Sequence, residues 1–292
     1  MRLWEKLSTN IFRSLFSKQL VKFEGNSPEQ ILKKSLSLLG PETLPEIKSY
    51  ITSRQHDSGG FMDKAGNPDL YYSLFGFFLA NAFNMPEIKT GLTAYVRKEI
   101  GGRKQEGIYL YCSAIMAAGL PLDQETQGNL RREISRNLDK QLGRQPAYAA
   151  FITLLACYYT NDFTGILRVR KHLNRLSKNN ELPSTVTAAL IILRHTFGRN
   201  TSGLNEELSG FYDTGGGFKA VRKAPVADLL STAVCLYAER FTGRDIRNIR
   251  PDCLNFVDSL YLNGGFGGNL LDPEPDIENT FYGLLALGSL AD

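Results

Sequence analysis

Three segments of the chain repeat one pattern: two glycines and a phenylalanine, a polar loop that contains proline, an aspartate, and then an apolar stretch. The copies occupy residues 59–83, 216–241 and 264–290, and their aspartates are Asp69, Asp228 and Asp276. Repeats of this kind are typical of proteins built from stacked supersecondary units. An aspartate before an apolar stretch is typical of a helix N-cap, so we predict that each copy ends in a capped helix.

Amphipathic segments alternate along the chain with segments that are apolar almost all round. Six such pairs can be counted, at residues 41–84, 87–120, 123–160, 161–197, 206–241 and 247–290. An amphipathic helix faces water on one side, whereas a helix that is apolar all round is buried. Six apolar helices inside and six amphipathic helices outside make a closed ring of helical hairpins with a continuous core. The sequence therefore predicts an all-α fold with a single domain over residues 27–292.

Residues 1–26 are predicted to form an extra N-terminal amphipathic helix. Trp4, Leu7, Ile11 and Leu15 recur at helical spacing, and basic residues supply the polar side. Such a helix packs on the body of the protein, lies on an anionic bilayer through residues 1–23, or binds a partner. The sequence leaves these alternatives open.

Composition places the chain among ordinary globular proteins. It has 292 residues, 42% of them hydrophobic, and a net charge of +4, which is a mild excess and not a nucleic-acid signature. The four cysteines are far apart and form no CxxC pair, so neither a disulfide framework nor a cysteine zinc site is expected. No apolar run reaches membrane-spanning length. We expect a cytoplasmic protein, peripheral at a membrane if residues 1–23 bind one.

The repeat resembles that of protein prenyltransferase β subunits and, more distantly, that of squalene and other class II terpene cyclases. The likeness rests on the Gly-Gly-Phe loops and on the Pro-Asp-aromatic pattern after the first of them, and it runs from about residue 41 to the end. It implies an (α/α)6 toroid, six helical hairpins around a central funnel. The β subunits of that family work with an α partner, so a protein partner is also implied. Fold alone does not fix activity.

The zinc site of protein prenyltransferases is matched only in part. In that family an Asp, a Cys two residues later and a His from the last repeat hold the metal. Asp228 matches the Asp, but Leu230 stands at the Cys position and Asn279 at the His position. Leucine offers zinc no donor atom and an amide oxygen is a poor one. The resemblance therefore implies a protein without zinc-dependent prenylation chemistry and without these metal ligands.

A basic cluster precedes Asp228. The resemblance implies a diphosphate-binding role for Arg222, which matches a family arginine, with Lys223 and Lys219 nearby. Arginine suits phosphate because its guanidinium can donate two parallel hydrogen bonds. The alternative is a solvated loop whose three cations bind nothing.

Alternating carboxylates precede the last apolar segment: Asp272, Glu274, Asp276 and Glu278. Crowded carboxylates raise one another's pKa, so one of them could be kept protonated as an acid. They could also bind Mg²⁺ through oxygen ligands. The alternative is an acidic loop that ends in an N-cap. Our candidate catalytic residues are Asp228, Asp276 and Glu278.

Aromatic side chains are predicted to line the central funnel. They lie on the apolar segments or at their ends, and they are Tyr71, Tyr72, Phe75, Tyr109, Tyr148, Tyr237, Phe281 and Tyr282. An aromatic, apolar barrel below a cationic mouth suits an isoprenoid chain with an anionic head, and aromatic faces stabilise carbocations. The alternative is that these rings are packed core.

Two functions follow from these patterns. The first is a divergent toroid that binds a prenyl-diphosphate-like ligand without zinc. If it catalyses a reaction, it would do so as a prenyltransferase-like transferase or as a cyclase-like isomerase or lyase. The second is a non-catalytic scaffold for a protein partner.

Overall fold

The computed structural model describes residue 23 and residues 25–144, 146–173 and 182–292. This part of the chain is mostly helical and carries only short strand pairs, as the sequence predicts for the all-α class. The N-terminal helix predicted for residues 1–26 falls mainly outside the described residues. The helices are α2 (Pro28–Ser35), α3 (Thr43–Ser53), α4 (Leu70–Ala82), α5 (Pro86–Gly102), α6 (Gly107–Gly119), α7 (Gln124–Arg144), α8 (Pro146–Tyr159), α9 (Phe163–Leu173), α10 (Ser184–Thr196), α11 (Ser202–Ser209), α12 (Leu229–Thr242), α13 (Arg250–Asp258) and α14 (Ile277–Leu290).

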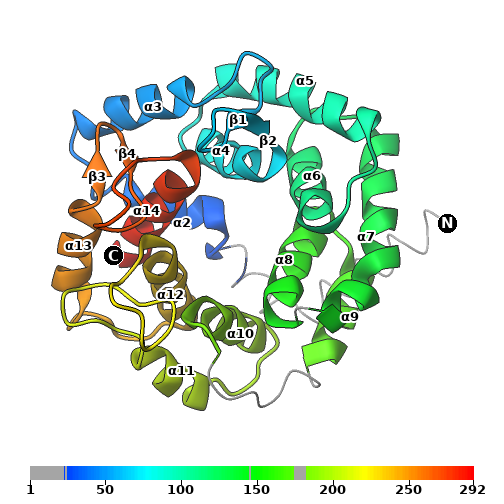
Figure 1. The fold of residues 1–292 in the computed structure, drawn as a ribbon. Helices are drawn as coiled ribbons and strands as arrows, with labels where there is room; N and C mark the ends of the chain where they lie inside the picture. The colour runs from blue at the N-terminus through cyan, green and yellow to red at the C-terminus, as the bar shows by residue number, and fades with distance from the viewer. Residues whose placement is uncertain (1–22, 24, 145, 174–181) are drawn as a thin grey trace.

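The even-numbered helices from α4 to α14 lie nearest the centre of the molecule, and the odd-numbered helices from α3 to α13 lie outside them (Figure 1). Each inner helix packs against the next one along the chain, and α14 also packs against α4. Helix α2 lies within the layer of inner helices, against α14 and α4.

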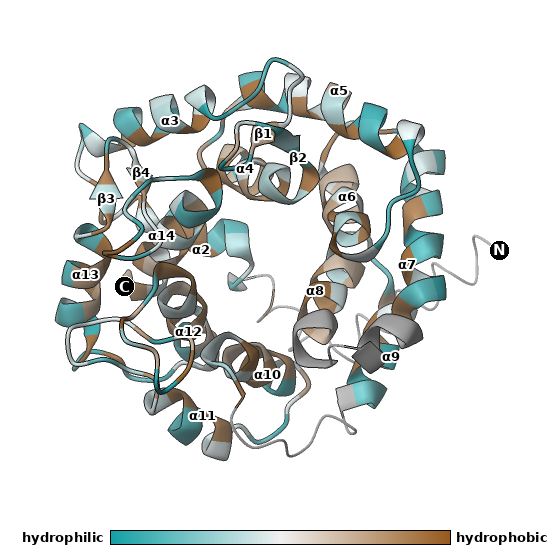
Figure 2. Cartoon of the chain, viewed as in Figure 1, coloured by the Kyte–Doolittle hydropathy of each residue, from teal (hydrophilic) through white to brown (hydrophobic). Residues whose placement is uncertain are grey.

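The difference between the two layers follows from the sequence. Inner helices are apolar on nearly all sides, while outer helices alternate polar and apolar faces (Figure 2). Helix α5 shows the outer pattern, because its buried Ile88, Leu92, Tyr95 and Val96 recur at helical spacing. Burial of one face positions an outer helix, whereas the inner helices form the core itself.

The three aspartates of the repeat cap inner helices, which confirms the prediction made from their positions. Asp69 accepts hydrogen bonds from the backbone N–H groups of Tyr71 and Tyr72 at the start of α4. Asp228 accepts from the N–H of Ser231 at the start of α12, and Asp276 from that of Asn279 at the start of α14. Each carboxylate thus satisfies a donor that the helix itself leaves free.

A hydroxyl group one turn into each capped helix fixes the Gly-Gly-Phe loop. The phenylalanine N–H donates to a serine or threonine four residues after the aspartate. The three bonds are Phe61 N to Ser73 Oγ at 2.9 Å, Phe218 N to Thr232 Oγ1 at 2.8 Å and Phe266 N to Thr280 Oγ1 at 3.3 Å. The bond holds the loop against the start of its helix. Two of these loops also form short antiparallel pairs, β1 (Phe61–Met62) with β2 (Pro68–Asp69) and β3 (Tyr261–Leu262) with β4 (Gly265–Phe266).

The first glycine of each loop lies against the backbone of an outer helix in another hairpin. A Cβ atom on Gly59 would lie 2.1 Å from the Gly91 carbonyl oxygen in α5, and one on Gly216 would lie 2.2 Å from that of Asp252 in α13. Gly264, in the last repeat, approaches the Glu46 carbonyl oxygen in α3 in the same way, at 2.6 Å. All three glycines have φ between 84° and 92°, which favours glycine further. The last loop therefore contacts the first outer helix.

Candidate functional site

The basic cluster before Asp228 is divided among separate contacts. Lys219 Nζ lies 3.2 Å from Asp213 Oδ1. The Arg222 guanidinium lies over the Phe211 ring, 5.2 Å from its centroid, and Nη2 donates to the Glu207 carbonyl oxygen at 3.4 Å. Lys223 is exposed. Lys219 and Arg222 thus contact groups around α11, while Asp228 is engaged in capping α12.

Asp228 itself is half-buried, and burial raises the pKa of its carboxyl group. Leu230 lies in the first turn of α12, two residues after Asp228. Asn279, at the position of the family histidine, donates from Nδ2 to Asp276 Oδ2 at 2.9 Å. Its amide therefore supports the cap of α14. Within the described residues, no three histidine, cysteine or acidic side chains gather closely enough to hold a metal ion.

The carboxylates before α14 belong to different environments. Asp276 is 2% exposed, and burial raises its pKa. Lys64, from the loop between β1 and β2, binds Asp272 Oδ2 at 2.6 Å and lies 3.6 Å from Asp276 Oδ2. Glu274 is exposed. The lysine thus occupies a position at which a cation would otherwise bridge two of these carboxylates.

Glu278 points toward α4 and not toward the other carboxylates of its loop. Its Oε1 accepts a hydrogen bond from the Tyr71 hydroxyl at 2.6 Å. Burial is the main cause of the raised pKa of Glu278, and the neighbouring Asp276 charge adds to it. The pair links the first and last repeats, and it places a carboxyl group that holds its proton to higher pH than usual beside a tyrosine.

An open recess of about 470 Å³ adjoins this pair. It is lined by Asp63, Asp69, Tyr71, Tyr72, Ile108 and Tyr109, at the N-terminal ends of α4 and α6. Tyr109 is 38% exposed, and the Asp69 charge is the largest cause of its raised pKa. Three of the tyrosines predicted for the funnel therefore meet in one recess, together with two carboxylates.

An aromatic wall continues from the recess into the molecule along α4 and α14. Tyr71 meets Phe75 edge to face, with ring centroids 4.9 Å apart. Phe75 in turn lies 5.1 Å from Phe281 and 5.6 Å from Tyr282. Phe75 and Phe281 are almost fully buried, so both also serve as core. The side chain of Tyr148, in α8, lies outside the described part of the structure.

The opposite end of the inner helices is occupied by the N-terminal residues. Phe23 packs on Tyr158 of α8, with ring centroids 4.5 Å apart. The Tyr237 hydroxyl donates to the Asn26 carbonyl oxygen, and the Tyr159 hydroxyl donates to Glu29 in α2. Tyr237, predicted to line the funnel, is thus buried beneath this segment.

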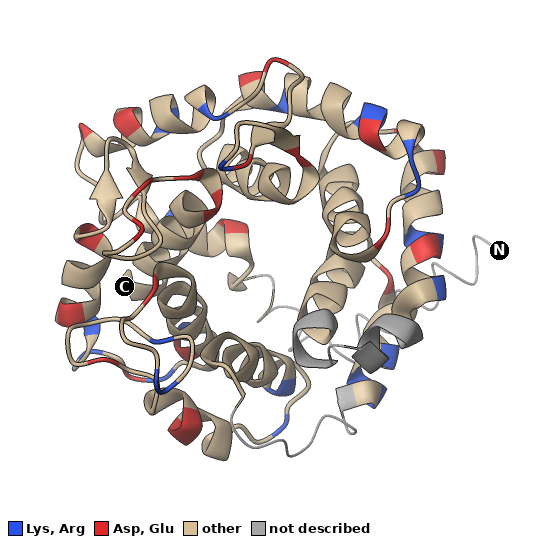
Figure 3. Cartoon of the chain, viewed as in Figure 1, with Lys and Arg blue, Asp and Glu red and all other residues tan. Residues whose placement is uncertain are grey.

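Two residues of the recess were not predicted from the sequence. Asp63 lies in the loop of the first repeat and Ile108 in the second helical pair, and only the folded chain brings them together. Asp69 was interpreted as a helix cap alone, although its carboxylate also lines the recess. Charged residues lie mainly on the outer helices and the loops (Figure 3), so the few acidic groups beside the inner helices are the informative ones.

Comparison with known protein families, curated proteins and solved structures gives no match for this chain. Nor does any helix of the described residues combine the length and apolar character needed to cross a bilayer. A function must therefore be argued from the arrangement of the side chains.

Proposed function

We propose that the two layers of helices form a closed (α/α)6 toroid of the kind found in prenyltransferase β subunits and terpenoid cyclases. Closure is supported by the packing of α14 on α4 and by the contact of Gly264 with α3. That contact repeats the one between Gly59 and α5. The last hairpin thus contacts the first hairpin in the same way as the first hairpin contacts the second.

The function proposed for this toroid is the binding of an isoprenoid-type ligand without zinc. The recess lined by Tyr71, Tyr72 and Tyr109 carries the proposal, because it has the size of a small-molecule site and its lining is largely aromatic. Asp63 and Asp69 also line it, so a neutral head group such as an alcohol suits it better than a diphosphate. A diphosphate would instead depend on Lys219, Arg222 and Lys223.

The candidate acid for such a ligand is Glu278, which does not line the recess but accepts a hydrogen bond from Tyr71, which does. Its raised pKa keeps the carboxyl group protonated to higher pH, and Tyr71 fixes its orientation. Protonation of an alkene by the Glu278 carboxyl group would leave a carbocation, which the rings of Tyr71 and Tyr72 would stabilise. Loss of a neighbouring proton to the Glu278 carboxylate would then give an isomerised alkene and restore the acid.

Thermal unfolding during titration with geranylgeraniol and with geranylgeranyl diphosphate tests the proposal. Binding to the native state at a hundred times the Kd stabilises it by about 2.7 kcal/mol. We expect a saturable rise in Tm with the alcohol that persists with a chelator. Tyr109→Ala should abolish this rise.

The matched control is Leu167→Ala on the outer helix α9, because Leu167 is 42% exposed and Tyr109 is 38% exposed. This variant should bind like the parent protein. A zinc-dependent rise, or no rise with either ligand, would contradict the proposal.

A second candidate is a scaffold for a protein partner. Leu270 and Leu271, in the loop before α14, are 64% and 78% exposed, which is costly for adjacent leucines in water. Loss of a co-purifying partner on Leu270→Ser and Leu271→Ser substitution, with geranylgeraniol binding absent throughout, would favour this function.

A further inference from the structure

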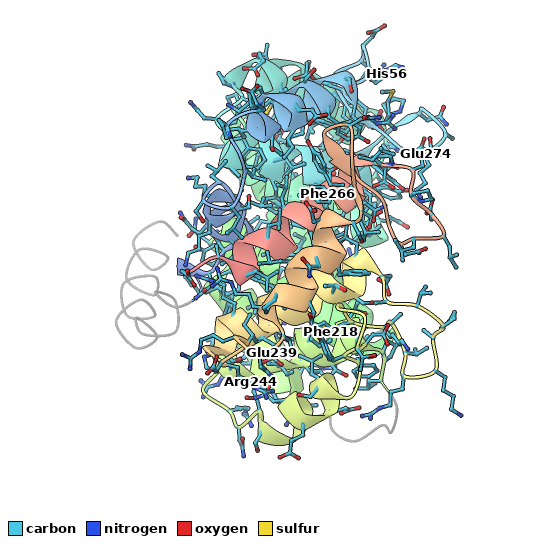
Figure 4. All side chains as sticks on the ribbon, turned by 90° about the vertical axis from the view of Figure 1, so that its left-hand side faces the viewer. His56, Phe218, Glu239, Arg244, Phe266 and Glu274 are labelled. Carbon is cyan, nitrogen blue, oxygen red and sulfur yellow. The ribbon has the colours of Figure 1, made fainter. Side chains whose placement is uncertain are left out.

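A second cavity, of about 340 Å³, lies at the end of the inner helices away from the repeat loops. Arg244 and Glu239 mark this region in Figure 4, where Glu274 and His56 mark the opposite end. Its charged lining residues are Arg240, Arg244, Arg247, Arg250, Asp245 and Asp292. The four arginines come from the end of α12, the connection that follows it and the start of α13, so a short stretch of chain brings them together.

The four guanidinium groups have different tasks. Arg244 holds Glu239, which is 5% exposed, with its Nε 3.2 Å from Glu239 Oε2, so this pair is structural. Arg240 donates to the carbonyl oxygens of Ser289 and Ala291. A guanidinium has five N–H donors, so these contacts leave part of the Arg240 donor capacity unused.

The remaining two arginines contact exposed carboxylates. Arg247 Nη2 lies 2.6 Å from Asp245 Oδ2, and the two side chains are 86% and 60% exposed. Arg250 Nη1 lies 2.7 Å from Asp292 Oδ1, and the Asp292 side chain is 92% exposed. The Arg250 side chain is only 27% exposed, so Asp292 is the exposed member of that pair. A carboxylate as exposed as that of Asp292 contributes little to stability, so another anion can replace it at small cost.

Positive charge exceeds negative charge around the cavity. Burial is the main cause of the lowered pKa of Arg240, and the Arg250 charge contributes to it. The pKa of Lys34 in α2 is also lowered. Burial is the larger cause, and the nearby positive charge of Arg240 is the smaller one. Four arginines and two acidic side chains, those of Asp245 and Asp292, thus line the cavity, and a further anion would relieve the repulsion among the arginines.

We infer that this arginine cavity binds a phosphate or diphosphate group, with Asp292 as the resident anion that the ligand displaces. Arg250 contacts the incoming oxygens through paired N–H groups, the geometry in which arginine binds phosphate best. Arg247, whose Nε and Nη2 bind Asp245, adds its positive charge to the site. Arg240 contributes from the buried side, and Arg244 remains with Glu239. The site is separate from the tyrosine recess and does not depend on the function proposed for it.

Isothermal titration of the full chain with inorganic pyrophosphate, at fixed ionic strength and with a chelator, tests the inference. We expect one saturable site. Arg250→Ala should weaken binding about tenfold, as expected for loss of one charge-assisted pair of hydrogen bonds. Arg136→Ala is the matched control, because Arg136 on α7 is 72% exposed and also pairs with an acidic neighbour, Glu133. It should leave the affinity unchanged.

Asp292→Asn supplies a test that misfolding cannot imitate. Removal of the resident anion should tighten pyrophosphate binding several-fold. Co-sedimentation with phosphatidic acid vesicles, against phosphatidylserine vesicles of equal surface charge, distinguishes a lipid source of the phosphate from a free one. Binding to pyrophosphate or selectively to phosphatidic acid supports the site. Absence of both, or equal losses in Arg250→Ala and Arg136→Ala, would overturn it.

Discussion

The carboxyl group of Glu278 has a raised pKa that depends on both its sequence neighbours and its burial in the fold. Its position among alternating acids suggested mutual repulsion as the cause of a raised pKa. Burial is the largest cause of the raised pKa of Glu278; the hydrogen bond from Tyr71 lowers the pKa in part, and the Asp276 charge raises it by less than burial does. A carboxyl group whose pKa is raised on folding binds more protons in the native than in the unfolded state. Stability therefore falls as pH rises from the ordinary carboxyl range through the raised pKa.

This linkage predicts the behaviour of Glu278→Gln. Glutamine keeps an oxygen that accepts from Tyr71 but has no charge to bury, so we expect a higher Tm than the parent protein at pH 7. The difference should shrink as pH falls toward 4 and vanish well below pH 4, where the parent carboxyl group is protonated in both the native and the unfolded state. Glu274→Gln, exposed in the same loop, removes the same charge and is the control. An equal gain from both variants at pH 7 would show that net charge, and not burial, is responsible.

Residue-scale prediction from the sequence succeeded where the rule was local. Capping by Asp69, Asp228 and Asp276 depends on a few neighbouring residues, and the pattern was sufficient to predict it. The contacts of Arg222 depend on Phe211 and Glu207, which approach it only in the fold. The proposed diphosphate role of Lys219, Arg222 and Lys223 stays a prediction.

At the scale of elements, the contact between a Gly-Gly-Phe loop and an outer helix recurs in all three repeats and joins neighbouring hairpins. The second glycine of each pair faces an aromatic ring one helical turn further along that outer helix. The pairs are Gly60 with Tyr95, Gly217 with Phe256 and Gly265 with Tyr50. Close approach to a neighbouring helix therefore requires glycine at the second position as well as at the first.

Gly264→Ala tests this contact at the place where the last Gly-Gly-Phe loop meets the first outer helix, α3. Alanine at a φ of +84° is strained, and its Cβ would lie 2.6 Å from the Glu46 carbonyl oxygen. We expect a loss of about 2–4 kcal/mol in the free energy of unfolding by urea. Gly66→Ala has the same strain at φ +85°, with nothing within 4 Å, and should lose only about 1 kcal/mol. Equal losses would mean that the contact with α3 contributes nothing.

Helix prediction was most successful for the amphipathic elements. The amphipathic helix that opens the pair predicted at residues 87–120 is α5 (Pro86–Gly102), and the one that opens the pair at 123–160 is α7 (Gln124–Arg144). Strong periodicity defines such helices locally. The position of α2 against α14 could not be predicted, because it depends on Gly288, where a Cβ would lie 1.9 Å from the Ile31 carbonyl oxygen.

At the scale of the whole molecule, the two ends of the inner helices differ in chemistry. One end has the tyrosine recess with Asp63 and Asp69, and the other has α2 and the arginine cavity. An apolar ligand and a phosphate group would thus bind at opposite ends. The sequence predicted an aromatic interior and a group of cations, Lys219, Arg222 and Lys223, at the end that carries the repeat loops. It did not indicate the arginine cavity at the other end.

The measurement that tests the proposed function most directly is photo-crosslinking with a benzophenone derivative of geranylgeraniol, followed by peptide mapping. The account predicts that label appears on α4 and α6, around Tyr71, Tyr72 and Tyr109, and that unmodified geranylgeraniol prevents it. Label confined to outer helices such as α5 and α7, or label that the unmodified alcohol fails to prevent, would contradict an isoprenoid site in the recess.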